Sequence, residues 1–540
     1  MTTVARGVLD VLGRAGVRTV FGLPGVHNLA FWRDAAGDPD IVVVRHEQTT
    51  VYAADGLARA TGGLGAALTT TGPGAVNAAA AFGEAAASGT PLLLIASEIS
   101  TRLARPGVVR GVLHEARDQA AIFEPLAKGV LRPRTPEDAV RAVAEAATVA
   151  MTWPRGPVYV DIPTDVLDLD VTIQATVGQP ERSAPHPGDL DRAVAAVEQA
   201  RTVVLWAGGG VVQAGATSEL AALAEHLGAP VITTFAARGA LPPDHPLLLG
   251  LPPHEPEVAA YVAGADLLLA VGTRFDGPFT RNWSMPRPPA LVSVNVSGPD
   301  LTTNYQPDVA VLGDARLALE ALLERTQRRD AAGSGAPEVR ARTRERLRTD
   351  PAGGPALEFL DALDEAVAGV DATVVVDMAI PGYWYGGYGR VGRARGLQYP
   401  IGWGTLGYAL PASVGAAVAR EHPVLAICGD GGLMYALGEL AVLREENLPV
   451  TVLVVDDGGY GMLRYDQDRA GDERRGVDLF RPDFVSLSRS FDIPAAVLRG
   501  TDGLSAALAD ALSSGGPRLV VLELALTPPR TTSPRWNDDD

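Results

Sequence analysis

Short apolar runs rich in valine, isoleucine and leucine recur along most of this 540-residue chain and alternate with alanine-rich stretches of helical character. Apolar runs separated by helices are typical of strands that are buried on both faces of a parallel sheet. The sequence therefore predicts an α/β fold. We expect strands at residues 41–44, 67–70, 91–97, 158–162, 203–209, 230–234, 267–272, 292–296, 373–378, 425–428, 450–455 and 520–526.

Two stretches interrupt the alternation and are predicted to be linkers. In residues 177–189 and 328–354, proline, glycine and charge replace the apolar periodicity. The length suits about three domains of ordinary size. We therefore expect three doubly wound parallel-sheet domains, at residues 1–176, 190–327 and 355–530, and a disordered tail at residues 531–540.

The overall charge and the cysteine content limit the partners and the compartment. A formal net charge of −18 argues against nucleic-acid and anionic-membrane partners. The single cysteine, Cys428, excludes an internal disulfide and a thiolate metal cluster. The first residues have no uninterrupted apolar segment, and no run of about 18 apolar residues follows. We expect a cytoplasmic protein.

Two glycine-rich turns that carry aspartates follow expected strands, at residues 429–432 (GDGG) and 456–459 (DDGG). Open α/β sheets bind ligands at the carboxyl ends of their strands. Glycines allow a diphosphate to approach the backbone, and hard carboxylate oxygens suit Mg²⁺ or Ca²⁺. A single GDG could be a tight strand-to-helix turn with a capping aspartate. The second turn favours a metal and phosphate site.

The spacing of these turns resembles the cofactor motif of thiamine-diphosphate enzymes, especially the acetolactate synthase and 2-oxo-acid decarboxylase superfamily. The resemblance implies thiamine diphosphate and Mg²⁺ as cofactors, with Asp430 and Asp457 as side-chain ligands of the metal and Gly459 as a carbonyl ligand. The usual residue at position 457 is Asn, so Asp adds negative charge beside the diphosphate. The resemblance further assigns cofactor contacts to Gly429, Gly431, Gly432, Tyr460, Gly461 and Met462, and the diphosphate end to residues 378–380.

A second resemblance lies near the start of the chain, where FGLPGVHN, RHEQTT and TTTGPGAVN are similar to the pyrimidine-binding domain of the same superfamily. It implies that Glu47 hydrogen-bonds N1′ of the pyrimidine and stabilises the imino tautomer that removes the C2 proton. Apolar surroundings would raise the pKa of such a carboxyl. The alternative is a solvated glutamate that caps a helix.

The stretch IGWGTLGYALPAS, residues 401–413, matches the family segment that shapes the bound cofactor. By this resemblance Leu406 props the cofactor into a V shape, and the Gly404 carbonyl accepts a hydrogen bond from its 4′-amino group. Ordinary packing is the alternative for both residues.

The substrate side is predicted to include Val26, His27, His114 and Gln119. Residues 107–119 resemble the corresponding stretch of 5-guanidino-2-oxopentanoate decarboxylases. A histidine there could move a proton to the substrate oxygen or hold a carboxylate, and a structural role is the alternative. The paired histidines that follow the pyrimidine motif in pyruvate and indolepyruvate decarboxylases are absent from the sequence, which disfavours simple pyruvate decarboxylase.

The central block resembles its family counterpart, but HPLLLG, residues 245–250, is followed by LPPHEPEV instead of the glycine-rich segment of flavin-containing acetolactate synthases. We therefore expect no FAD. The resemblance extends from about Val4 to Leu526.

The family implies decarboxylation of a small-molecule 2-oxo acid, carboligation of the resulting enamine to a second carbonyl, or both. A lyase that cleaves a 2-hydroxy ketone or 2-hydroxyacyl compound is an alternative, as is a cofactor-binding homologue without turnover, although the presence of Glu47 argues against the latter. In this family the pyrimidine-binding and diphosphate-binding domains meet across a two-fold axis. We therefore expect a homodimer or homotetramer with shared active sites.

Overall fold

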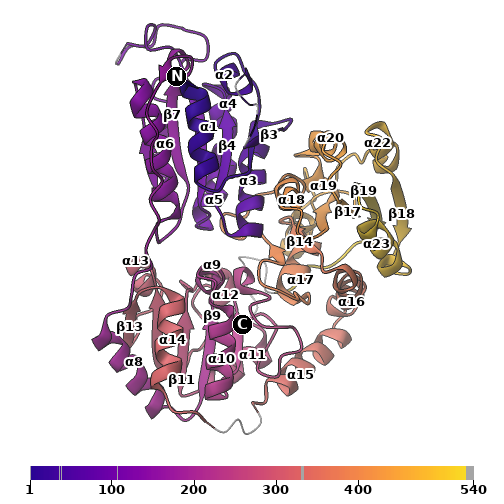
Figure 1. Ribbon diagram of the computed structural model, residues 1–540. Coiled ribbons are helices and arrows are strands. Elements are labelled where there is room, and N and C mark those ends of the chain that lie inside the picture. Colours follow the sequence, from indigo (N-terminus) through magenta and orange to yellow (C-terminus); the bar gives the residue numbers. More distant parts are fainter. Residues whose placement is uncertain are drawn as a thin grey trace.

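Three parallel sheets with helices on both faces form the body of the molecule (Figure 1). The structure, a computed structural model, describes residues 2–530 apart from residues 34, 36, 38, 106 and 330–333. All twelve predicted strands are present, which confirms the predicted fold class. The limits of the three domains stay predictions, and the expected disordered tail lies outside the described residues.

The first sheet has six parallel strands, in the order β3 (Asp40–Val43), β2 (Thr19–Gly22), β4 (Gly65–Thr69), β5 (Leu92–Glu98), β7 (Val158–Pro163) and β6 (Gly129–Leu131). Helices α1 (Val4–Arg14) and α6 (Pro136–Met151) cover one face, and α3 (Glu47–Thr61) and α5 (Ala79–Ala87) cover the other. The remaining elements are β1 (Thr2–Thr3), β8 (Asp170–Val171), α2 (Leu29–Arg33), α4 (Pro73–Asn77), α7 (Thr164–Leu167) and the 3-10 turn η1 (Ala120–Ile122).

The central sheet has five parallel strands, in the order β10 (Val231–Thr233), β9 (Val203–Ala207), β11 (Leu267–Val271), β12 (Ala290–Asn295) and β13 (Val309–Leu312). One face packs on α8 (Pro187–Gln199), α10 (Thr217–Leu227) and α14 (Ala315–Arg325). The other faces α11 (Pro256–Ala263) and α12 (Gly277–Thr280). Shorter elements are α9 (Gly209–Gln213), α13 (Gly298–Thr302) and η2 (Phe235–Ala237).

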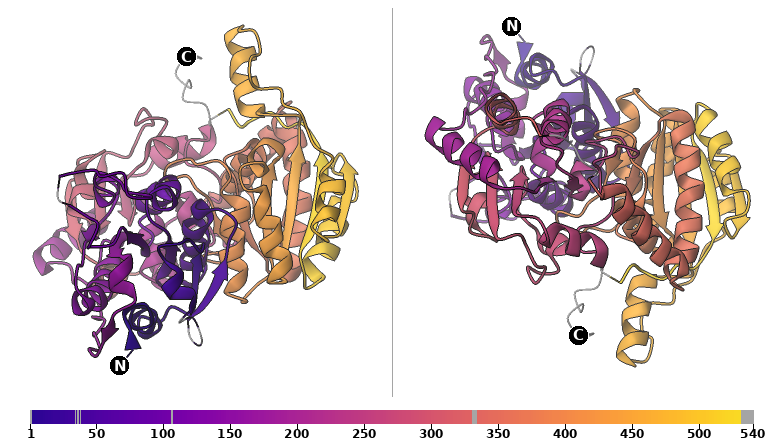
Figure 2. Two further views of the ribbon diagram at one scale, coloured as in Figure 1. Left: turned by 90° about the horizontal axis from the view of Figure 1, so that it is seen from above. Right: turned by 90° about the horizontal axis from the view of Figure 1, so that it is seen from below.

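The third sheet has six parallel strands, in the order β15 (Leu397–Gln398), β14 (Thr373–Val376), β16 (Val424–Gly429), β17 (Val450–Asp456), β19 (Arg518–Glu523) and β18 (Ala495–Arg499). One face packs on α16 (Gly353–Val370), α17 (Ile380–Tyr388) and α23 (Leu504–Ser513). The other packs on α18 (Ala409–Val418), α20 (Leu440–Glu445) and α22 (Phe484–Ser490). Between the strands lie α19 (Asp430–Leu433), η3 (Leu437–Glu439) and α21 (Gly461–Ala470), and α21 has no buried residue and projects from the body in Figure 2.

The apolar core between the first and third sheets is continuous, because α3 and α18 pack directly on each other. Small residues permit this close approach: a Cβ on Gly56 would lie 2.1 Å from the carbonyl oxygen of Ala412, and one on Gly415 would lie 1.8 Å from that of Ala53. The helix pair therefore fixes how these two domains sit within one chain. That placement decides which predicted site residues can meet.

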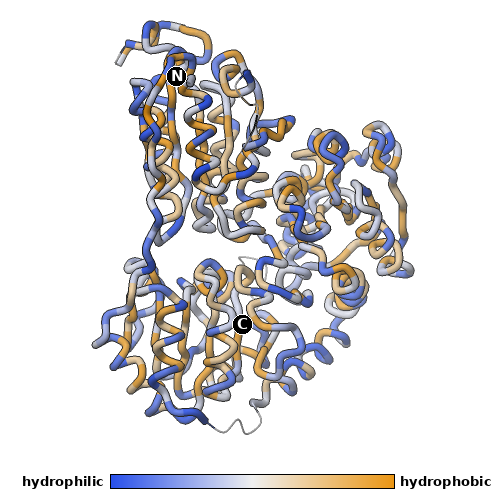
Figure 3. Tube along the Cα trace, viewed as in Figure 1, coloured by the Kyte–Doolittle hydropathy of each residue, from blue (hydrophilic) through white to orange (hydrophobic). Residues whose placement is uncertain are grey.

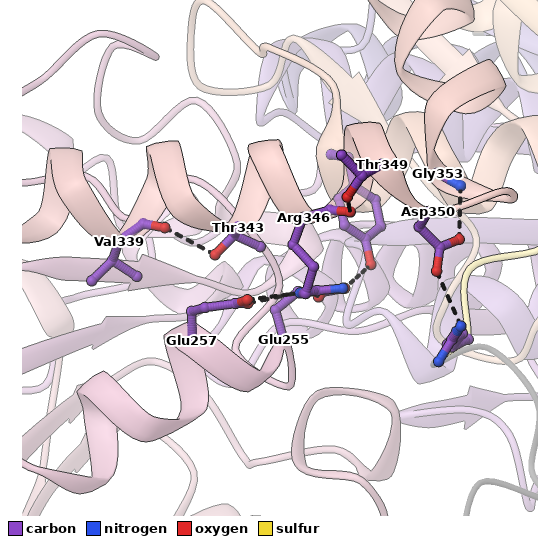
Figure 4. Close-up of polar contacts among 10 residues, drawn as sticks. Glu255, Glu257, Val339, Thr343, Arg346, Thr349, Asp350 and Gly353 are labelled. Atoms are coloured by element: carbon purple, nitrogen blue, oxygen red, sulfur yellow. Dashed lines mark hydrogen bonds and ion pairs between the residues drawn. The ribbon is translucent and has the colours of Figure 1, made fainter.

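The predicted linker at residues 328–354 contains α15 (Ala336–Thr349), which the loss of apolar periodicity did not indicate, and its role as a linker stays a prediction. The helix is rich in arginine and coloured largely blue in Figure 3, which hides its buried stripe of Val339, Thr343 and Leu347. Arg346 ties the helix to the central domain through Glu255 and Glu257 (Figure 4). The other predicted linker, residues 177–189, is irregular as far as His186. In the described part of the chain no helix is both long and apolar enough to cross a membrane.

Candidate active site

The predicted site residues lie where strand order reverses in the first and third sheets. In the first sheet β2 and β4 are neighbours, so the turn that carries Val26 and His27 lies beside the turn at residues 70–74. In the third sheet β14 and β16 are neighbours, so Asp377 lies beside Asp430. Crevices at such reversal points are the usual ligand sites of open α/β sheets.

Asp430 and Asp457 form a pair of carboxylates at the ends of β16 and β17. Burial, and the charges of Asp457 and Asp456, raise the pKa of Asp430 to about 7. Burial also raises the pKa of Asp457. Two like charges that repel each other at a partly enclosed site are the setting in which a divalent cation binds well.

The backbone around this pair is closely packed and requires glycine at two positions. Gly459 has a φ of +149°, and a Cβ there would lie 2.1 Å from the Val477 carbonyl oxygen. A Cβ on Gly461 would lie 2.2 Å from Oδ2 of Asp457. Among the described residues no cluster of three or more His, Cys, Asp or Glu side chains could hold a metal ion. A cation here would therefore draw on the Gly459 carbonyl and on ligand oxygens, which fits a metal bound together with a diphosphate.

Arg464 is a partner of Asp457 that sequence reasoning missed. Its guanidinium donates 2.8 Å to Oδ1 and 3.0 Å to the backbone carbonyl of Asp457, from the first turn of α21. The charge of Arg464 opposes the effect of burial on the pKa of Asp457. It thus offsets the negative charge that Asp adds where the family usually has Asn.

Asp377 is a second supporting residue that sequence reasoning missed. It is buried at the end of β14, and its carboxylate accepts hydrogen bonds from Gly407 N at 3.0 Å and Met378 N at 2.9 Å. Burial raises its pKa to about 6, against the effect of these bonds. Asp377 therefore anchors the loop that carries Gly404 and Leu406. An acid directly after the strand TVVV, as at Asp430, was the signal that could have revealed it.

The same loop is held at its other end by the first domain. The backbone N–H of Trp403 donates to Glu84 at 2.8 Å, and Trp403 packs on Gly83. Glu84 is also bonded to Arg59, which donates 3.1 Å to the Tyr399 carbonyl. Leu406, with an exposed fraction of 36%, lies between these two anchors. The structure thus places Leu406 next to the Asp430 turn, and its role as a prop stays a prediction.

Glu47 is the first residue of α3 and follows the partly exposed edge strand β3 after three intervening residues, so the prediction that this strand is buried is wrong. Its Oε2 accepts a hydrogen bond of 3.0 Å from Asn77 Nδ2, and Oε1 lies close to Gly74. Within the described residues, no hydrogen bond or ion pair joins Glu47 to Asp430, Asp457 or the loop of Leu406. Polar contacts therefore do not link Glu47 to these residues in the described part of the chain.

The predicted substrate residues lie at the carboxyl ends of the strands of the first sheet. The rings of His27 and His114 lie 5.2 Å apart, and His114 adopts a left-handed φ of 65°. Their Nδ1 atoms are buried and have no hydrogen-bond partner among the described residues. Burial, then the charge of His114, lowers the pKa of His27, while Val26 beside it is exposed.

Gln119 is fully buried next to this pair. Its side-chain oxygen accepts from Gly72 N at 2.5 Å, and its nitrogen donates to Ser97 O at 3.0 Å and to the Tyr159 hydroxyl at 2.9 Å. These bonds fix the turn after β4, against which the His114 carbonyl packs. A direct contact between Gln119 and a substrate stays a prediction.

A cavity of about 360 Å³ opens at the strand-order reversal of the central sheet, where β9 adjoins β11, and it reaches the first and third domains. Arg155, Arg274 and Arg395 line it. Residues 251–257 do not, since Glu255 and Glu257 bind Arg346 instead (Figure 4). The expected absence of FAD stays a prediction.

Three family models match the chain. The N-terminal TPP binding domain of thiamine pyrophosphate enzymes matches residues 2–122, the central domain residues 190–322, and the C-terminal TPP binding domain residues 381–522. Together they span more than half of the chain.

Curated relatives cover nearly the whole sequence. A Pseudomonas aeruginosa protein named "Probable 2-ketoarginine decarboxylase AruI" is 36% identical over 97% of this chain and 94% of its own length. The acetolactate synthase large subunit of Parasynechococcus marenigrum is 33% identical over 96% of this chain and 86% of its own length. The crystal structure of benzoylformate decarboxylase from Polynucleobacter necessarius has a TM-score of 0.83 at 24% identity, over 98% of this chain and 100% of that one, and so shares the fold.

Proposed function

The chain belongs to the thiamine pyrophosphate enzyme family, and we propose that it decarboxylates a small 2-oxo acid, joins the resulting unit to a second carbonyl, or does both. The observation that carries this proposal is the pair of strand-end carboxylates, Asp430 and Asp457, which burial leaves with raised pKa values beside two glycine-rich turns. Relatives named as a decarboxylase and as acetolactate synthases support the two outcomes.

We propose that Asp430, Asp457 and the Gly459 carbonyl hold Mg²⁺, and that Gly429, Gly431, Gly432, Tyr460, Gly461 and Met462 contact the cofactor. When bound, thiamine diphosphate supplies the nucleophilic carbon and the electron sink for cleavage of the bond next to a carbonyl. The protein supplies the position of this group, the metal and the proton donors.

Glu47 is proposed to share a proton with N1′ of the bound pyrimidine. Because Asn77 occupies Oε2, we assign this proton to Oε1. A carboxyl in this role works best when its pKa lies near the working pH. His27 and His114 are proposed to move a proton at the substrate carbonyl oxygen, since their adjacent rings lie on the same sheet edge as Val26.

The active unit is proposed to be a homodimer or a dimer of dimers with shared sites. Glu47 has no hydrogen bond or ion pair to the Asp430 turn among the described residues, which is compatible with a second chain that supplies one of them. Exposed apolar side chains surround both halves: Val26, Val76, Leu113, Trp403, Leu406, Met434, Tyr435 and Leu463. Apolar groups gathered in this way mark surfaces that a partner covers.

The substrate is proposed to be a 2-oxo acid whose side chain reaches the His27 and His114 edge. The relative named as a 2-ketoarginine decarboxylase favours a guanidino 2-oxo acid for the decarboxylation. The test is CO₂ release from holoenzyme supplied with Mg²⁺, thiamine diphosphate and a panel of 2-oxo acids that includes guanidino, aliphatic and aromatic members. Chromatography of the products distinguishes an aldehyde from an acyloin. No CO₂ from any member, with cofactor demonstrably bound, would leave a lyase or a non-catalytic homologue.

A further inference from the structure

Glu439, in the 3-10 turn η3 of the third domain, is a buried carboxylate with 1% of its side chain exposed. Its hydrogen bonds reach the first domain. Thr49 Oγ1 donates to Oε1 at 2.8 Å, and the backbone N–H of Arg45 lies 3.2 Å from both Oε1 and Oε2. Burial raises the pKa of Glu439 to about 7, and the bond from Thr49 opposes that shift.

The donors Arg45 and Thr49 lie on either side of Glu47. The first turn of a helix leaves N–H groups without intrahelical partners, and its orientation depends on what binds them. Here the N-cap residue His46 accepts the N–H of Gln48 at 3.1 Å through its own side chain. Glu439 binds this region from the third domain, through the backbone N–H of Arg45 and the hydroxyl of Thr49, at the junction where α3 meets α18.

We propose that Glu439 is a positioning residue for Glu47. By holding Arg45 and Thr49, it sets the direction in which Glu47 leaves the first turn of α3. The inference rests on the proposed role of Glu47 toward the cofactor. A carboxylate that is hydrogen-bonded from two sides has little freedom to rotate. Glu439 can therefore fix the orientation of the Glu47 turn without touching the cofactor.

The position of Glu439 in the chain gives this hold a further consequence. Asp430 begins α19, Tyr435 packs against Gly407 in the Leu406 loop, and Glu439 ends the next turn. One continuous segment therefore joins the proposed metal ligand to the turn of Glu47. If sites are shared between subunits, Asp430 and Glu47 of one chain serve different cofactors. Glu439 then couples the two active sites of a dimer through a short segment of the third domain.

The alternative is that Glu439 only helps to hold the first and third domains together. Another contact across the same junction provides a matched control for this alternative. Arg45 also forms an ion pair with Glu445, through its side chain and across the same junction, but the pair is partly exposed and does not bind the backbone of the Glu47 turn. Glu445→Gln should therefore disturb the junction without releasing Glu47. Glu439→Leu removes every acceptor, whereas Glu439→Gln keeps one oxygen for Thr49 and Arg45.

The first readout uses cofactor-free dimer. Hydrogen–deuterium exchange of the amides in residues 47–51 should become roughly tenfold faster in Glu439→Leu, and stay near wild type in Glu445→Gln. Glu439→Gln should lie between them. If Glu439→Leu does not fold, Thr49→Val and Glu439→Gln each remove part of the hold and should each give a smaller increase.

The second readout uses holoenzyme. In Glu439→Leu the C2 proton of bound thiamine diphosphate should exchange roughly 10- to 100-fold more slowly while the cofactor dissociation constant stays unchanged, because only the direction of Glu47 is lost. Glu439→Gln should restore most of the rate. Wild-type exchange at both the amides and C2 in Glu439→Leu would overturn the inference, and so would equal effects of Glu439→Leu and Glu445→Gln. Normal C2 exchange in Glu47→Gln would instead overturn the proposed role of Glu47 itself.

Discussion

The turns that carry Asp430 and Asp457 are held by residues of the third domain alone, whereas the turn that carries Glu47 is held by Asn77 of the first domain and Glu439 of the third. The first arrangement follows from one sheet, since parallel strands end at a common edge. The second depends on how α3 and α18 pack. The comparison teaches that the metal half can form wherever the third domain folds, while the Glu47 half requires correct assembly of domains and chains.

The largest effect should come from a substitution in the metal half of the site, which the third domain forms alone. We expect Asp430→Ala to abolish saturable, Mg²⁺-dependent binding of thiamine diphosphate, because it removes a charged metal ligand that no other described side chain replaces. Isothermal titration calorimetry with and without Mg²⁺ measures this. Asp457→Asn is the control and should retain binding, since the amide still offers an oxygen. Undiminished binding in Asp430→Ala would refute the metal assignment.

A substitution in the Glu47 half of the site should leave cofactor binding intact and remove turnover. Glu47→Gln should bind cofactor as the wild type does but lose roughly 10²- to 10⁴-fold in rate, because an amide cannot exchange the proton that the carboxyl shares. Single-turnover CO₂ release and C2 proton exchange by NMR report this. Asn77→Ala, which frees Oε2, should have a much smaller effect. Wild-type exchange in Glu47→Gln would show that another residue does the work.

The metal half can be sharpened through Arg464. We expect Arg464→Met to tighten Mg²⁺ binding by roughly tenfold, because the guanidinium competes with the cation for Asp457 Oδ1. Titration of cofactor binding with Mg²⁺ measures the change. Arg481→Met, which removes the exposed partner of Asp456, is the control and should change affinity less. Weaker Mg²⁺ binding in Arg464→Met would mean that the guanidinium orients Asp457 for the metal.

The junction itself should show a pH dependence of stability. The folded-state pKa of Glu439, about 7, lies above that of an unfolded glutamate, so its contribution is fully present below about pH 4 and is lost as pH rises toward 7. The loss is at most about 4 kcal/mol. Glu439→Gln removes this titration. Thermal melts of cofactor-free protein should therefore show the variant gaining stability relative to wild type between pH 4 and 7, and a constant difference would contradict the shifted pKa.

Much of the fold was predictable, because each buried parallel strand appears in the sequence as a short apolar run. Runs such as TVVV at residues 373–376 and LAIC at residues 425–428 identify strands, and the acids and glycines after them identify the edge where ligands bind. Helix α15 was not predicted, since its four buried residues are spread among arginines in a stretch rich in charge.

The supporting contacts of the site were hidden for a different reason. Arg464 meets Asp457 from the next helix, Asp377 meets Gly407 across a loop, and Glu439 meets Thr49 from another domain. None of these pairs has a fixed spacing in the sequence, because tertiary packing alone brings the partners together. The sequence could therefore locate the reacting groups and not the residues that hold them.

The most direct test of the account concerns the sharing of sites between chains. Glu47→Gln and Asp430→Ala are each expected to be inactive as homodimers. Mixed under conditions that exchange subunits, they should regain activity, because each mixed dimer has one site with both Glu47 and Asp430 intact. Native mass spectrometry of tagged subunits quantifies the mixed dimer, and activity should rise in proportion to it. Demonstrated exchange with no return of activity would contradict the shared site.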